Sequence, residues 1–261
     1  MRPVLSFAIV QRFADHFSGA AAAYAAHRPD YPAELFAFAA ALAPGRSRAW
    51  DCATGNGQAA IALASHFARV AATDASAAQL AHARSHPRVS YHVALAEASA
   101  VRGAAVELVT VAQALHWFRL DRFYAEVRRV LVPGGALCVW SYDDPTVDEP
   151  ALDAALQRFN HEIMGPWWPT DRAAVGEGYR TLPFPFAELP APTLVLERWW
   201  TADELVAYVR TWSAVARARA AGIDDPVRPL EAELRALTAA DRAARHHVRW
   251  PLVVRAGRVT D

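Results

Sequence analysis

A short run with two glycines, residues 51–58 (DCATGNGQ), is the first feature of the sequence that could bind a cofactor. Glycines at such a turn let the backbone approach a ligand closely and lead into a helix, at whose N-terminus the ligand lies. Asp74 follows the next apolar segment, and an ionised carboxylate there can accept hydrogen bonds from both hydroxyls of a ribose. Ala96 and Glu97 follow a third apolar segment, where they would meet the edge of an adenine. These three cues together predict a cofactor that contains a nucleoside.

Two cofactors fit the glycine turn. With Ala60, the turn matches the dinucleotide pattern G-x-G-x-x-G/A, which would favour NAD. The acidic Asp51 at the end of the first apolar segment, and the Pro133-Gly134-Gly135 turn before the fifth, instead favour S-adenosylmethionine (SAM). An oxidoreductase would also need a catalyst of hydride transfer, and the sequence contains neither a Tyr-x-x-x-Lys pair nor any lysine.

The elements that must position these residues alternate between strand and helix. We expect strands at residues 47–52, 69–73, 89–93, 106–112 and 136–140, and helices at 58–67, 77–85 and 120–131. Such alternation favours a parallel sheet covered by helices on both faces, and the nearly continuous apolar character of the strands agrees with this. The sequence therefore predicts a Rossmann-like, doubly wound α/β fold with the cofactor at the carboxyl ends of the strands.

Beyond residue 145, predicted strands and helices no longer alternate regularly. Residues 150–190 are rich in proline and aromatic residues, which predicts an irregular cap. A strand is expected at 194–200 and a last strand at 248–254. A helix is expected at 201–220, with Thr201 and Glu204 at capping-box spacing.

Composition narrows the function further. Acidic and basic residues balance at 27 each, so neither a nucleic acid nor an anionic membrane is an expected partner. All basic residues are arginine, which excludes chemistry that needs a lysine amine. No apolar run approaches a membrane span and no signal peptide is recognised, so we expect a cytoplasmic monomer or homodimer. Cys52 and Cys138 lie in strand-like runs as core residues, and no metal site is expected.

At several points the residues resemble class I SAM-dependent methyltransferases (methyltransferase type 11), and more narrowly the trans-aconitate methyltransferase-like group. The resemblance covers most of the chain and rests on these segments: 24–31 (YAAHRPDY), 51–58, Asp74, 96–97, 113–118 (QALHWF), 133–135, 140–145 (WSYDDP), 165–168 (GPWW), 208–213 (YVRTWS) and 257–259 (GRV). The resemblance implies a seven-stranded, mostly parallel sheet with an antiparallel last strand and a C-terminal cap insertion over the substrate. It also implies one domain, residues 1–261, with a cofactor-binding core at 13–145, a cap and substrate region with one sheet strand at 146–245, and the last strand at 246–261.

The resemblance implies that Tyr24 and Arg28 close over the methionine end of SAM, with Gln113 and Ala114 beneath it. For Arg28 a surface salt bridge is the alternative role. The full set of expected cofactor contacts is Tyr24, Arg28, Asp51, Ala53, Gly55, Gly57, Gln58, Asp74, Ala75, Gln79, Ala96, Glu97, Gln113, Ala114 and Trp117. Ala53 departs from the family, because many members have a glycine there. Its methyl group would be tolerated if φ is negative, or it would tighten the pocket.

His116 and Trp117 are expected to face the methyl group, and His116 is the candidate for a catalytic base. A hydrogen-bonded structural histidine is the alternative. Aromatic faces stabilise a sulfonium by cation–π attraction, and arginine can hold a substrate carboxylate. The expected substrate contacts are His116, Trp140, Tyr142, Trp167, Trp168, Arg172, Tyr208, Arg210 and Trp212, with ordinary core packing or surface exposure as the alternative for the aromatic residues and the arginines.

The sequence thus predicts a SAM-dependent methyltransferase that acts on a small molecule, at a carboxylate or a hydroxyl. A non-catalytic SAM-binding protein and an NAD-dependent oxidoreductase are the alternatives.

Overall fold

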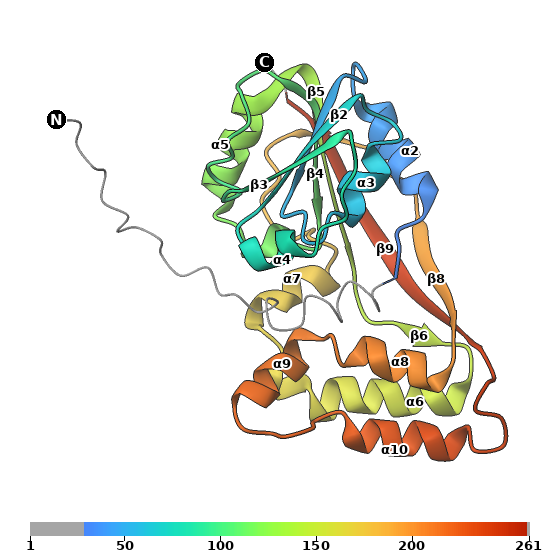
Figure 1. Ribbon diagram of the computed structural model, residues 1–261. Coiled ribbons are helices and arrows are strands. Elements are labelled where there is room, and N and C mark those ends of the chain that lie inside the picture. The colour runs from blue at the N-terminus through green and yellow to red at the C-terminus, as the bar shows by residue number, and fades with distance from the viewer. Residues whose placement is uncertain (1–28, 260–261) are drawn as a thin grey trace.

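A sheet of nine strands forms the centre of the computed structural model, which describes residues 29–259. The strand order is β3-β2-β1-β4-β5-β9-β6, and the first five of these run parallel (Figure 1). The bounds are β1 Arg48–Cys52, β2 Arg69–Asp74, β3 Val89–Val93, β4 Val106–Ala112, β5 Leu131–Tyr142 and β9 His246–Arg258. The predicted α/β fold with a mostly parallel sheet and an antiparallel last strand is confirmed, because β9 pairs antiparallel with β5. The predicted number of seven strands is wrong.

The two extra strands follow from the length of β9. This strand pairs along one edge with β5 and β6 (Thr146–Val147), and along the other with β7 (Ala187–Leu189) and β8 (Leu194–Trp200). The expectation of one sheet strand within residues 146–245 is therefore wrong, since β6, β7 and β8 all come from that segment and pair with β9. We did not predict β6 and β7 from the sequence, because strands of two or three residues are too short to show an alternation of apolar and polar residues.

Helices cover both faces of the sheet, as the apolar strands predicted. Helices α2 (Ala33–Leu42) and α3 (Gln58–Leu63) lie on one side of the sheet, and α5 (Leu120–Val130) lies on the other (Figure 1). Side chains of β1 alternate between the two layers, because Ala49 packs with α2 and α3 while Trp50 packs with α5. Helix α4 (Ala77–Ala81) packs on β2 and β3. Both α3 and α4 are shorter than the predicted helices at 58–67 and 77–85.

The predicted turn at residues 133–135 lies inside β5 rather than before it. Gly134 adopts a positive φ of 74°, and the pairing of β4 with β5 shifts register between Val106 and Leu108. A glycine in the left-handed region at a register shift is typical of a β-bulge. The turn signal therefore marks an irregularity within a strand.

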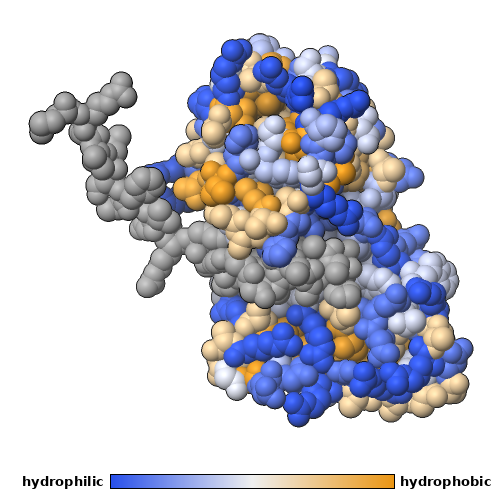
Figure 2. All heavy atoms as spheres, in the orientation of Figure 1, coloured by the Kyte–Doolittle hydropathy of each residue, from blue (hydrophilic) through white to orange (hydrophobic). Residues whose placement is uncertain are grey.

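The cap contains more helix than the sequence predicted. It comprises α6 (Pro150–Arg158), α7 (Ala173–Gly176), α8 (Ala202–Val209), α9 (Ser213–Ala220) and α10 (Arg228–Leu237), with a π turn at Phe159–Ile163 and 3-10 turns at Gly165–Trp167 and Thr170–Arg172. Helices α6, α8, α9 and α10 gather beyond the sheet (Figure 1), and much of the surface they show in Figure 2 is hydrophilic. No helix within residues 29–259 is long and apolar enough to cross a membrane.

The single helix predicted at 201–220 is two helices. Thr201 caps α8 with the predicted capping box, in which its hydroxyl accepts from the Glu204 N–H and the Glu204 carboxylate accepts from the Thr201 N–H. The helix ends before Trp212, whose backbone is extended at φ −68° and ψ 141°. The break places Trp212 and Ser213 at the wall of a cleft described below.

Candidate active site

The glycine turn and Asp74 lie side by side because β1 and β2 are parallel neighbours. The register pairs Cys52 with Thr73, so the loop after β1 begins beside the end of β2. The Gly55 N–H donates to Oδ2 of Asp74 at 2.8 Å, and the Ser76 N–H donates to Oδ1 at 2.8 Å. The Asp74 carboxylate is therefore fixed beside the turn, where it is predicted to bind a ribose.

The turn itself is built from left-handed residues. Gly55 and Gly57 have φ values of 56° and 84°, and Ala53 has 54°. A Cβ on Gly57 would lie 2.2 Å from the hydroxyl oxygen of Tyr91, so only glycine fits there. The condition set for Ala53, a negative φ, is not met. A residue with a side chain costs about 1–2 kcal/mol in this region, so Ala53 strains the turn.

Asp51 supports the turn from within the sheet. Its side chain is buried, and its two oxygens accept hydrogen bonds from the hydroxyls of Thr54 at 2.5 Å and Thr110 at 2.7 Å. Burial raises the pKa of Asp51 to about 6, partly offset by these two hydrogen bonds and reinforced by the charge of Asp74. The sequence pointed to Asp51 as a cofactor contact but did not reveal its bond to Thr110, because 59 positions separate the two residues along the chain although their strands are neighbours in the sheet.

The residues beside Asp74 suit the nucleoside of SAM. The side-chain oxygen of Gln79 is buried and has no hydrogen-bond partner among the described residues. A Cβ on Gly55 would lie 4.0 Å from that oxygen, so the bare glycine leaves space in front of it. A buried acceptor without a donor is costly, and a ribose hydroxyl or an amino group would satisfy it. The donor and acceptor chemistry of this corner therefore fits SAM.

Two predicted cofactor contacts have polar partners within the protein. The Gln58 side chain donates to the Pro29 carbonyl at 3.1 Å and to Asp30 at 2.9 Å. Oε1 of Glu97 accepts from the N–H of Arg119, the residue that precedes α5, at 2.8 Å. Both side chains thus hold loops at the edge of the sheet. A cofactor bound there would contact side chains that already have hydrogen-bond partners in the protein.

The three predicted cofactor contacts that are alanines after strands β2, β3 and β4 supply no polar side-chain group. Ala96 and Ala114 are buried, and Ala75 is half-buried. Tyr24 and Arg28 lie outside the described residues.

A cleft lies where β4 and β5 end and the cap begins. It brings together eight of the predicted residues, which come from segments far apart in the chain. They are Gln113, His116, Trp117, Tyr142, Trp168, Arg172, Tyr208 and Trp212. The sequence assigned no role to its other lining residues, Asp143, Asp144, Pro169, Val175 and Ser213.

Gln113 joins the ends of β4 and β5 at the floor of this cleft. Its backbone has a positive φ of 57°, its N–H donates to the Trp140 carbonyl at 2.9 Å, and its side-chain amide donates to the Tyr142 carbonyl at 2.8 Å. A strained residue with a side chain is often found at a functional site. These two hydrogen bonds hold the end of β4 beside the end of β5, where the cleft lies.

Two predicted aromatic contacts do not reach the cleft. Trp140 is fully buried and packs edge-on against Tyr31 and Phe36, with ring centroids 5.6 and 6.0 Å away. Trp167 packs against the core and does not line the cleft. The structure does not support the prediction for Trp140. Trp140 and Tyr142 lie on the same face of β5, but Tyr142 is the last residue of the strand and lines the cleft, whereas Trp140 lies two residues deeper and packs with α2.

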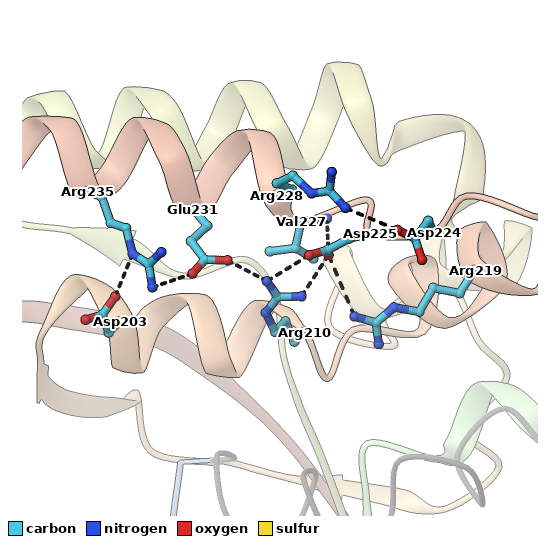
Figure 3. Close-up of polar contacts among 9 residues, drawn as sticks. All are labelled: Asp203, Arg210, Arg219, Asp224, Asp225, Val227, Arg228, Glu231 and Arg235. Atoms are coloured by element: carbon cyan, nitrogen blue, oxygen red, sulfur yellow. Dashed lines mark hydrogen bonds and ion pairs between the residues drawn. The ribbon is translucent and has the colours of Figure 1, made fainter.

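Arg210 is also not in the cleft. Its guanidinium bonds Asp225 through two nitrogens at 2.8 and 3.1 Å, and Glu231 at 2.6 Å (Figure 3). Arg235 extends the same network from Glu231 to Asp203. These residues tie α8 to α10 and to the loop before α10. The structure does not support the prediction of a substrate carboxylate on Arg210, because the protein's own carboxylates occupy the guanidinium.

His116 lines the cleft and has an aromatic environment. Its Nδ1 lies 3.1 Å from the hydroxyl of Tyr179, and the Trp117 ring lies 4.5 Å away between centroids. Tyr179 is itself buried. The sequence showed Tyr179 only as one aromatic residue among many, since 63 positions separate it from His116.

Arg172 reaches across the cleft from the cap to the end of β5. Its guanidinium stacks on Trp168 at 3.8 Å from the ring centroid and bonds Asp143 at 3.2 Å and Asp144. Burial, followed by the charge of Asp144, raises the pKa of Asp143. Two carboxylates against one guanidinium leave little positive charge for an anionic substrate.

The described residues contain no group of three or more His, Cys, Asp or Glu placed to hold a metal ion. Both cysteines are buried in strands, and burial raises the pKa of the Cys138 thiol to about 12. Neither thiol is therefore suited to act as a nucleophile.

Comparisons with known proteins agree with this geometry. Residues 50–139 match the family described as "Methyltransferase domain". A Dictyostelium discoideum protein described as "Putative methyltransferase" is 30% identical over 217 residues, which cover 82% of this chain and 82% of that protein. A solved structure from Anaeromyxobacter dehalogenans, described as "a Putative Type II Methyltransferase", is 45% identical, with a TM-score of 0.80, and the match covers 88% of this chain and 97% of that one. Another, from Anabaena variabilis, is 17% identical with a TM-score of 0.51 over 85% of this chain and 98% of that one, and shows the fold alone.

Proposed function

Because this chain belongs to the methyltransferase family, we propose that it transfers a methyl group from SAM to a hydroxyl of a small molecule. The chain is a SAM-dependent methyltransferase, and the NAD-dependent alternative has no support. The observation that carries it is the position of His116 in a cleft with aromatic walls at the ends of β4 and β5.

SAM supplies an electrophilic methyl group on a sulfonium when it is bound. Asp74 and Gln79 would accept hydrogen bonds from its nucleoside, and the bare backbone at Gly55 would let that nucleoside approach. The aromatic faces of the cleft would attract the sulfonium and exclude water. These residues hold and align the reactants, and alignment alone is worth roughly 7–11 kcal/mol for such a displacement.

A hydroxyl acceptor suits the polar groups of the cleft better than a carboxylate does. A hydroxyl must lose a proton, and His116 is placed to take it. A carboxylate needs no base but needs a cation, and both predicted arginines are bonded to the protein's own carboxylates. Flat aromatic walls also favour a planar acceptor.

A carboxylate acceptor is the second candidate. It is favoured by the segments that resemble the trans-aconitate methyltransferase-like group, among them residues 165–168 and 208–213. The single-domain organisation, a cytoplasmic location, a monomer or homodimer and the absence of a nucleic-acid partner stay predictions from the sequence.

The acceptor class can be measured before the acceptor is known. The protein is incubated with SAM labelled in its methyl group and a mixed extract of small metabolites, and the product is then heated in alkali. A methyl ester releases the label as methanol, whereas a methyl ether keeps it. We expect retained label, and release as methanol would refute the hydroxyl proposal.

The role of His116 is tested in the same assay. Because a general base contributes typically 10²- to 10⁴-fold, we expect His116→Gln to lower the rate at least a hundredfold. His92→Gln changes an exposed histidine on β3 and should leave the rate unchanged. Equal rates for the two variants would contradict the assignment of His116 as the base.

A further inference from the structure

Two successive residues with left-handed backbone lie next to His116, which lines the cleft. Gly178 has a φ of 60° and Tyr179 has a φ of 61°. A Cβ on Gly178 would lie 2.5 Å from a methyl carbon of Val253, so the segment is pressed against β9. Left-handed backbone at a residue with a side chain is unfavourable and persists only where the surroundings hold it.

Arg255 of β9 holds this strained segment. Its guanidinium bonds the Tyr179 carbonyl and, at 3.0 Å, the Leu182 carbonyl. It also bonds Glu188 at 2.6 Å and lies over the Phe184 ring at 4.5 Å. The result is that Tyr179, although it follows a glycine in a loop, is buried and has a fixed direction.

The fixed direction points the Tyr179 hydroxyl at His116. Its oxygen lies 3.1 Å from Nδ1, and the two rings are tilted by 30° with centroids 5.8 Å apart. We propose that Tyr179 is a positioning residue that holds His116 in the tautomer with its proton on Nδ1, so that Nε2 receives the proton of the acceptor. The proposal rests on the proposed function, in which His116 acts as the base.

The tautomer matters because the two ring nitrogens have opposite roles. If Nδ1 carries the proton, it donates to the tyrosine oxygen and Nε2 is the basic nitrogen. As the acceptor oxygen bonds to the methyl carbon, its O–H bond breaks and the proton moves to Nε2, while the sulfur keeps the electron pair of the broken S–CH₃ bond. The imidazolium that forms still donates from Nδ1 to Tyr179. With the proton on Nε2 instead, the basic nitrogen would face the buried tyrosine and could not serve the cleft.

The wild-type protein tests the proposal directly. Nitrogen-15 NMR of histidine-labelled protein distinguishes a protonated from a basic ring nitrogen, and the His116→Gln variant identifies the signals of His116. At a pH where the ring is neutral, with S-adenosylhomocysteine bound, we expect the proton on Nδ1. A proton on Nε2 would overturn the proposal, whatever the activity of the enzyme.

Tyr179→Phe removes the hydroxyl and keeps the ring. We expect the proton of His116 to redistribute toward Nε2, and the kcat for labelled methyl transfer into the metabolite extract to fall about tenfold, with KM for SAM unchanged. Tyr124→Phe is the matched control, because Tyr124 is also buried and its hydroxyl donates to a carbonyl, that of Pro183 at 2.6 Å. That control should change neither the tautomer nor kcat.

Failure of this proposal can be told apart from failure of the proposed function. If His116 is not the base, Tyr179→Phe still changes the tautomer while kcat stays the same. If Tyr179 is merely structural, the variant loses stability and affinity for S-adenosylhomocysteine while the tautomer is retained, and that result would overturn the positioning role.

Discussion

Replacing Asp51 with asparagine should stabilise the protein at neutral pH. Asp51 is buried in β1, and both its oxygens accept hydrogen bonds from threonine hydroxyls, those of Thr54 and Thr110. Asparagine has nearly the same shape. Its oxygen can accept from one hydroxyl and its amide can donate to the other, because a hydroxyl both donates and accepts. The substitution therefore removes a buried charge and can keep a hydrogen bond to each threonine hydroxyl.

The magnitude follows from the pKa of Asp51. Burial raises this pKa from 3.8 to about 6, so the folded protein binds a proton more tightly than the unfolded chain does. Stability then falls as the pH rises from about 4 to about 6, since the folded state must give up that proton. At 1.36 kcal/mol per pKa unit, the charge costs the fold about 3 kcal/mol above pH 6.

The assay is urea denaturation of the wild type and Asp51→Asn at several pH values. We expect equal free energies of unfolding at the acidic end, near pH 4, and a variant more stable by about 3 kcal/mol at pH 7. Asp121→Asn removes an exposed charge on α5 and should show no such divergence. If Asp51→Asn is less stable than the wild type at pH 7, the carboxylate is held by more favourable interactions than the structure indicates.

Three further predictions concern the turn, the ribose site and the cap. Ala53→Gly should raise the free energy of unfolding by about 1 kcal/mol by relieving a left-handed alanine, and no gain in a melting experiment would contradict that strain. Asp74→Ala should weaken S-adenosylhomocysteine binding at least tenfold in calorimetry, because bonds to a charged acceptor are lost, and unchanged affinity would remove Asp74 from the site. Arg210→Met should cost about 1–2 kcal/mol of stability, because two half-buried carboxylates lose the guanidinium that bridges them and keep only Arg219 and Arg235 as cationic partners (Figure 3). Arg228→Met breaks an exposed pair and should cost almost nothing.

Much of the sheet could be predicted because its strands carry their signal locally. The bounds of β3, β4 and β8 agree with the apolar runs from which they were predicted. The same holds for the start of α8, where Thr201 and Glu204 form their capping box within one turn of helix. Such features depend on neighbours in the sequence, so the sequence shows them.

The cap was harder to predict because its elements depend on distant partners. Strands β6 and β7 form only because their backbones pair with β9. The break before Trp212 separates two helices that we predicted as one from the sequence, and neither a glycine nor a proline indicates it. Local propensity does not contain this information, since tertiary packing overrides it.

Residue types and their order along the chain were enough to indicate a glycine turn, an acid after the second strand, and a histidine after the fourth. They were enough because parallel strands carry their carboxyl ends, and whatever follows them, to one edge of a sheet. Only the tertiary structure decided which side chains face the cleft and which are bonded elsewhere. It buried Trp140, tied Arg210 to Asp225 and Glu231 and placed Tyr179 against His116, because these outcomes depend on contacts between segments far apart in the chain.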